Sequence, residues 1–165
     1  MAMTTTALET KTGELALEIT RVFNAPRDLV FKAWTDPEHM AKWGGPEGYS
    51  ATTVELDARP GGAWRLGMRS PEGDEHLQGG VIREIVPPER LVYTFAWEEA
   101  DGSPGHETLV SITLAEHGPN ATQTLMTFRQ GTFENVESRD GHREGWDSAF
   151  NVLDAFLTSE AASRV

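Results

Sequence analysis

The chain has 165 residues, of which 38% are hydrophobic and 24% charged, and its formal net charge is -12. This composition is typical of one globular domain, and the negative charge argues against binding to nucleic acid or to an anionic membrane surface. Because the chain contains no cysteine, disulfides, thiolate nucleophiles and metal sites with cysteine ligands are excluded.

Residues 1–13 are rich in threonine and lack the basic and then apolar pattern of a signal peptide. We expect them to form a flexible tail, followed by a single domain over residues 14–160. The chain also lacks an apolar run of the roughly 18 residues that a membrane span needs. Together with the absence of cysteine, these features favour a cytoplasmic protein.

A strand and two short helices are predicted first. Residues 15–23 alternate between apolar and polar types, which is typical of a strand. Pro26 suits the first turn of a helix, where a missing N–H costs little. Asp36 and Pro37 suit the N-cap and the first position of a second helix. The run Trp-Gly-Gly-Pro over residues 43–46 ends that helix.

Period-two alternation then predicts six strands joined by short turns, which form an antiparallel meander. They are expected over residues 52–58, 63–69, 76–86, 91–98, 106–115 and 122–129. The pair Gly79 and Gly80 predicts a bulge or sharp bend. A last helix, starting at Ser138 or Gly141 and ending at Ser159, is indicated by a broad apolar stripe at helical spacing.

This order predicts an α+β fold. A seven-stranded, curved antiparallel sheet wraps around the long C-terminal helix, and two short helices lie between the first and second strands. Such a sheet leaves a cavity beside the helix, and the predicted ligand-binding residues are Trp43, Trp64, Leu66, Tyr93, Phe95, Trp97, Ile112, Met126, Phe128, Trp146 and Phe150. The alternative is that these side chains form an ordinary packed core.

Three polar residues near strand ends are possible anchors for a ligand: Glu98, His106 and Arg129. The alternative is that they face the solvent, as charged and imidazole side chains commonly do. His142 and Trp146 lie one helical turn apart and should contact each other. We find no spacing typical of a metal site and no nucleophile elbow, so neither a metal nor another cofactor is expected and no catalytic residue is assigned.

Several motifs carry a resemblance to a known family. They are VFNAP at residues 22–26, VFKAWTDP at 30–37, WG at 43–44, DARPGG at 57–62, IVPPERL at 85–91 and HREGW at 142–146. On these motifs, residues 15–157 resemble the START-like, birch-pollen-allergen-like helix-grip superfamily (SRPBCC). Within it they are similar to the homologues of the activator of the ninety-kilodalton heat-shock protein ATPase. The resemblance implies the helix-grip fold, binding of apolar or amphipathic small molecules, and no fixed catalytic residues.

These observations together predict a carrier or sensor that binds a small apolar or aromatic molecule between the sheet and the C-terminal helix. One alternative is a cyclase- or hydrolase-type enzyme acting on a hydrophobic substrate in the same cavity. A second alternative, by analogy with the family, is a co-chaperone-like protein-interaction module. A homodimer would protect an edge strand of the meander.

Overall fold

The computed structural model describes residues 15–164, so the predicted tail over residues 1–13 lies outside the described residues. The elements are β1 (Ala16–Phe23), α2 (Arg27–Thr35), α3 (Pro37–Trp43), β2 (Ser50–Leu56), β3 (Ala63–Arg69), β4 (Glu75–Val86), β5 (Arg90–Trp97), β6 (Thr108–His117), a 3-10 turn η1 (Pro119–Ala121), β7 (Gln123–Gly131) and α4 (Val136–Ser163).

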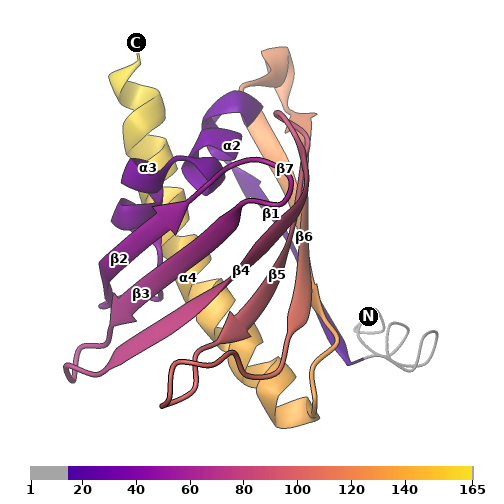
Figure 1. The fold of residues 1–165 in the computed structure, drawn as a ribbon. Coiled ribbons are helices and arrows are strands. Elements are labelled where there is room, and N and C mark those ends of the chain that lie inside the picture. Colours follow the sequence, from indigo (N-terminus) through magenta and orange to yellow (C-terminus); the bar gives the residue numbers. More distant parts are fainter. Residues whose placement is uncertain (1–14, 165) are drawn as a thin grey trace.

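The seven strands form one antiparallel sheet in the order β1-β7-β6-β5-β4-β3-β2. The first strand therefore pairs with the last, and β1 and β2 are the two edges. The sheet curves around α4, while α2 and α3 cross from one edge of the sheet to the other (Figure 1). The predicted helix-grip architecture is confirmed.

The two short helices start and stop where the sequence predicts. The side chain of Asp36 accepts a hydrogen bond from the backbone N–H of Glu38 at 2.9 Å, with Pro37 at the first helical position. The backbone N–H of Gly44 closes the end of α3 on the carbonyl of Met40. Such caps satisfy backbone groups that a helix terminus leaves without partners.

The last helix is longer than predicted and begins at Val136. Its start is set by Asn135, whose side chain accepts a hydrogen bond from the N–H of Ser138 at 2.7 Å. The second half of α4 packs into the core, with Phe150, Leu153 and Leu157 fully buried. The first half borders the cavity described below.

The bulge predicted at the glycine pair lies elsewhere. The pairing of β4 with β5 keeps its register through Gly79 and shifts only between Ile82 and Glu84. Gly80 instead allows a close approach, because a Cβ atom there would lie 1.9 Å from the carbonyl oxygen of Thr94. A glycine inside a strand commonly marks such contact between backbones.

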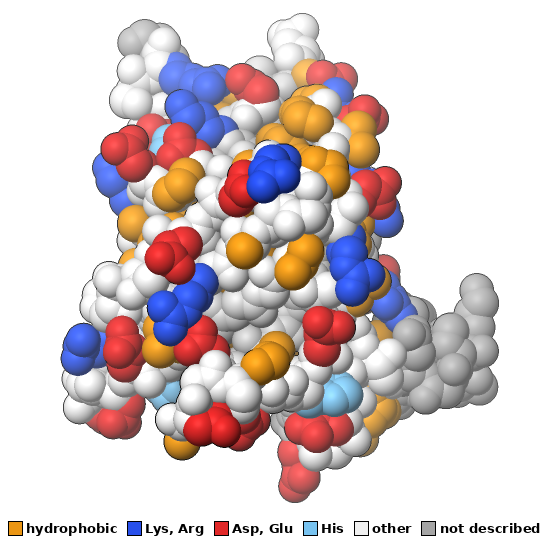
Figure 2. All heavy atoms as spheres, viewed as in Figure 1, with side chains coloured by type: hydrophobic (Ala, Val, Ile, Leu, Met, Phe, Trp, Pro, Cys, Tyr) orange, Lys and Arg blue, Asp and Glu red, His pale blue; other side chains and the backbone are white. Residues whose placement is uncertain are grey.

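Acidic and basic side chains are interspersed over the face of the molecule seen in Figure 1, as Figure 2 shows. Within residues 15–164, none of the helices combines the length and the apolar character that crossing a bilayer requires.

Candidate ligand-binding site

A cavity of about 350 Å³ lies between the concave face of β2–β5 and the first half of α4. The end of α3 and the loop that follows it close one side. The lining is largely apolar and aromatic: Trp34, Met40, Trp43, Pro46, Val54, Leu56, Trp64, Leu66, Met68, Ile82, Leu91, Tyr93, Phe95, Trp97, Trp146 and Ala149. This volume and this kind of lining are typical of sites for small molecules.

Alternation along three neighbouring strands places the wall. Every second residue of a strand points to the same face of the sheet. The positions that point into the cavity are Trp64, Leu66 and Met68 on β3, Gln78 and Ile82 on β4, and Tyr93, Phe95 and Trp97 on β5. The residues of the wall are therefore neighbours across paired strands, although they lie far apart in the sequence.

Hydrogen bonds hold most indole rings of the lining in place, although the buried Nε1 of Trp34 has no partner within residues 15–164. Trp64 Nε1 donates to the carbonyl of Thr94 at 2.9 Å, and Trp146 Nε1 donates to Oε1 of buried Gln130 at 2.7 Å. Trp43 Nε1 donates to the carbonyl of Ala33 at 2.8 Å. With their N–H groups engaged inside the protein, these rings present apolar surface to the cavity in fixed orientations.

Small residues on α4 keep the cavity open. Gly141, Gly145 and Ala149 follow one another at four-residue spacing and all line the cavity. A Cβ atom built at either glycine would meet no atom within 4 Å. Since a glycine inside a helix costs about 1 kcal/mol relative to alanine, these two positions lower helix stability and leave space that larger side chains would fill.

His142 forms part of the wall in its neutral form. Its Nδ1 lies 2.7 Å from the carbonyl of Ser138, and its Nε2 accepts a hydrogen bond from Trp97 Nε1 at 2.8 Å. The carbonyl can only accept and the indole can only donate, so the proton lies on Nδ1. Burial lowers the pKa of His142 below its ordinary value, partly offset by the bond to Ser138.

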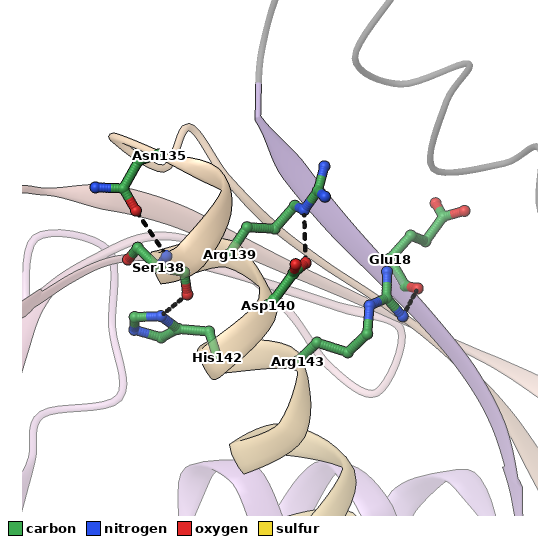
Figure 3. Close-up of polar contacts among 7 residues, drawn as sticks. All are labelled: Glu18, Asn135, Ser138, Arg139, Asp140, His142 and Arg143. Carbon is green, nitrogen blue, oxygen red and sulfur yellow. Dashed lines mark hydrogen bonds and ion pairs between the residues drawn. The ribbon is translucent and has the colours of Figure 1, made fainter.

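The first turns of α4 divide their polar groups between two sides (Figure 3). His142 turns toward the cavity, whereas Arg143 reaches the other way and donates to the carbonyl of Glu18 on β1 at 3.3 Å. Arg139 pairs with its neighbour Asp140 at 3.1 Å. The contact of Arg143 with β1 ties the helix to the far edge of the sheet, so the face with the small residues stays toward the cavity.

One ion pair lies beside the cavity. Arg65 borders the cavity, but on β3 it alternates with the inward Trp64 and Leu66. Its guanidinium donates two hydrogen bonds to the carboxylate of Glu98, at 2.6 and 3.0 Å. The hydrogen bonds from Arg65 hold the pKa of Glu98 below its usual range. The charge on Arg65 is therefore already neutralised by the protein.

Comparison with protein families adds to this geometry. The family described as Activator of Hsp90 ATPase homolog 1-like protein matches residues 24–158. The chain belongs to this family. The resemblance drawn from the sequence motifs is confirmed, and the family's fold is a ligand-binding type of scaffold.

Solved structures agree with this assignment. The AHSA1 protein of Silicibacter pomeroyi is 26% identical with a TM-score of 0.80, covering 88% of this chain and 99% of that one. A protein of Chromobacterium violaceum is 32% identical with a TM-score of 0.75, covering 86% and 96%. A protein of Mycobacterium smegmatis is 28% identical with a TM-score of 0.75, covering 88% and 91%. A search of curated proteins finds no match.

The structure brings most of the predicted ligand-binding residues together. Those that line the cavity are Trp43, Trp64, Leu66, Tyr93, Phe95, Trp97 and Trp146. Four others, Ile112, Met126, Phe128 and Phe150, lie in the packed core instead and do not line the cavity. They face the same side of the sheet, but α2 and the second half of α4 cover them. For these four, the alternative of an ordinary core describes the structure.

None of the three predicted polar anchors lines the cavity. Glu98 lies just outside and is bound to Arg65. His106 is exposed, and its Nε2 lies 2.7 Å from the carbonyl of Thr132. Arg129 lies on β7 opposite Glu18 and Ser111 of the neighbouring strands. Over residues 15–164, no group of three or more His, Asp and Glu side chains gathers into a possible metal site.

Three lining residues were not predicted as part of the site, namely Gln78, Gly141 and Gly145, and His142 was predicted only to contact Trp146. The two glycines carried a usable signal, because they interrupt an otherwise apolar helical stripe at a cost in helix stability. Gly141 was considered as a possible start of the helix, and neither glycine was recognised as an interior position that faces empty space.

Acid should destabilise the protein through His142. In the unfolded chain this imidazole takes up a proton as the pH falls below its ordinary pKa of about 6.5, whereas in the folded protein burial delays the uptake. As the pH falls below about 6.5, the free energy of unfolding therefore decreases, by at most about 1.4 kcal/mol per pH unit. Urea unfolding at pH 7.5 and 5.5 should show that acidification lowers the free energy of unfolding less in His142→Gln than in the unmodified protein.

The matched control is His117→Gln, because His117 is exposed at the end of β6. Acidification should lower its free energy of unfolding as much as that of the unmodified protein. If His142→Gln also loses as much stability on acidification as the unmodified protein, then burial of this imidazole does not drive the pH dependence.

Proposed function

We propose that this protein binds a small, mainly apolar molecule with aromatic character in the cavity between β2–β5 and α4, as a carrier or sensor. The observation that carries the proposal is a cavity of about 350 Å³ whose aromatic walls are held by hydrogen bonds while the facing helix is lined by glycine. Close packing is the rule in protein interiors, so a space of this size kept open by residues that weaken a helix is a feature of function.

Binding without chemical conversion is supported by the polar groups around the cavity. Both ring nitrogens of His142 are engaged, by Trp97 and by Ser138. The Arg65 guanidinium is held by Glu98. A general acid or base needs a free position within hydrogen-bond reach of the substrate, so these groups favour a role in shaping the site over a role in catalysis.

A titration with N-phenyl-1-naphthylamine tests the proposal directly. This neutral aromatic probe fluoresces more strongly in apolar surroundings, and energy transfer from the lining tryptophans should report its position. We expect saturable binding of one molecule per chain at micromolar concentration, as is usual for a preformed apolar site. Quenching of Trp64, Trp97 and Trp146 should follow the same curve.

The control is the same titration in urea above the unfolding midpoint, where the cavity no longer exists. A probe signal that rises in a straight line without saturation, or that survives unfolding, would contradict the proposed function.

A further inference from the structure

Two buried polar side chains face the cavity without a protein partner that satisfies them. Tyr93 on β5 is 6% exposed and Gln78 on β4 is 5% exposed, and both line the cavity. Within residues 15–164 no hydrogen bond involves the Tyr93 hydroxyl, and burial is the one cause that raises its pKa. The Gln78 amide nitrogen contacts only the sulfur of Met68, at 3.7 Å, which leaves the amide oxygen without a donor. Neither this hydroxyl nor the Gln78 amide oxygen is among the fully enclosed atoms that lack a partner, so both keep some surface open to the cavity. Buried polar groups are normally hydrogen-bonded.

The chemistry of each group limits what it can accept. A thioether accepts hydrogen bonds but cannot donate them, so the amide nitrogen of Gln78 points to Met68 and the oxygen is the free atom. That oxygen requires a donor. Burial raises the pKa of the Tyr93 hydroxyl far above its ordinary value, so this group stays a neutral phenol that can both donate and accept.

The two groups lie toward opposite ends of the wall. On β4, Gln78 is opposite Trp97, while Tyr93 is opposite Ile82, four residues further along. Four residues of strand span roughly 13 Å. The surface between them is aromatic, because the Trp64 and Phe95 rings lie with centroids 5.8 Å apart. A ligand that reaches both polar groups must therefore cross an apolar stretch lined by aromatic rings.

The charges around the cavity disfavour an anion. Arg65 is the one lysine or arginine among the lining residues, and it is already paired with Glu98. The acidic lining residues are Glu55 and Glu137, and the whole chain has a net charge of -12. A buried carboxylate without a positive partner is costly. A ligand with a carboxylate would find no free cationic side chain in this cavity.

We propose that the ligand is a neutral molecule with a flat, rigid, apolar body and a hydrogen-bonding group such as a hydroxyl at each end, one donating to Gln78 and the other bonded to Tyr93. This inference rests on the proposed function and names the chemical class of molecule that the same cavity takes.

A matched series of probes tests it: biphenyl, 4-hydroxybiphenyl, 4,4′-dihydroxybiphenyl and biphenyl-4-carboxylate, each displacing N-phenyl-1-naphthylamine. The variants are Tyr93→Phe and Gln78→Met, which remove the polar atoms and nearly keep the volume. We expect the diol to bind at least about tenfold more tightly than biphenyl, since each added hydrogen bond contributes about three- to tenfold. Each variant removes one of the two hydrogen bonds, so its affinity for the diol should fall about three- to tenfold, while its affinity for biphenyl should not change.

Thermal unfolding of the free variants separates a role in ligand recognition from a role in the fold. Removing a buried polar group that has no partner should leave the melting temperature unchanged or raise it. A fall in melting temperature combined with unchanged affinity for the diol would assign both groups to structure and overturn the inference.

The outcomes distinguish the two proposals. If the unmodified protein binds biphenyl and its diol equally well, or binds the carboxylate as tightly as the diol, this inference is overturned while the proposed function stands. If neither biphenyl nor N-phenyl-1-naphthylamine binds at all, the proposed function is overturned and this inference with it. The comparison within the unmodified protein decides the question even if a variant fails to fold.

Discussion

Replacing Gly145 by tryptophan should abolish ligand binding without unfolding the protein. Gly145 lies on the cavity face of α4, and a Cβ atom there meets no atom within 4 Å. An indole at this position would occupy the space between α4 and the strands, where a ligand ring would otherwise lie. We expect the affinity for N-phenyl-1-naphthylamine to fall by about a hundredfold or more, because an indole would fill a large part of a cavity of about 350 Å³ and leave too little space for the rings of the probe.

The stability of the same variants distinguishes occlusion from damage. Gly145→Ala removes the conformational cost of a glycine inside a helix and should raise the free energy of unfolding by about 0.5–1 kcal/mol. It adds one methyl group to the cavity and should weaken probe binding no more than about threefold. If Gly145→Trp remains folded in urea titrations and still binds the probe with unchanged affinity, the ligand does not use this cavity.

The architecture could be predicted from the sequence because each element carries its own local signal. The N-cap at Asp36 and the proline after it mark α3, and alternation in β3 and β5 marks which side chains face inward. Such signals depend on neighbours within a few residues. The short turns between the strands predicted an antiparallel meander around the last helix, and the family motifs spread over most of the chain implied the same helix-grip fold.

Whether a residue that faces inward lies in the packed core or lines the cavity could not be predicted in the same way. Phe128 on β7 and Trp64 on β3 both face the concave side, yet Phe128 packs against Trp146 and Phe150 of α4 while Trp64 lines open space. The difference depends on where α4 lies across the sheet, which is a tertiary property. Alternation determines the face of a sheet and says nothing of what covers that face.

The polar environment of the cavity was missed for a related reason. Arg65 meets Glu98, and Trp97 meets His142, across 33 and 45 residues of sequence. These contacts depend on strand register and on the position of α4 relative to β5, and a short sequence motif predicts neither. Glu98 was recognised as a polar residue of the right region, but its partner decides that it neutralises Arg65 and leaves the cavity without a free positive charge.

Replacing Gly80 by alanine should destabilise the protein strongly. The added Cβ atom would lie 1.9 Å from the carbonyl oxygen and 2.6 Å from the carbonyl carbon of Thr94. Both are backbone atoms of β5, so the clash cannot be relieved by a change of rotamer, and β4 must separate from β5. Overpacking costs of this kind and the loss of a buried hydrogen bond together predict a fall of about 3 kcal/mol in the free energy of unfolding, measured in urea.

The control is Gly141→Ala, which adds the same methyl group to a helical position with no atom within 4 Å and should stabilise the protein slightly. An unfolding free energy of Gly80→Ala within 0.5 kcal/mol of the unmodified value would show that the two strands are not so close. The consequence reaches the site, because the carbonyl of Thr94 accepts the hydrogen bond from Trp64 Nε1 across the space that Gly80 leaves free. Even where Gly80→Ala stays folded, Trp64 should lose its fixed orientation, and probe binding should weaken along with stability.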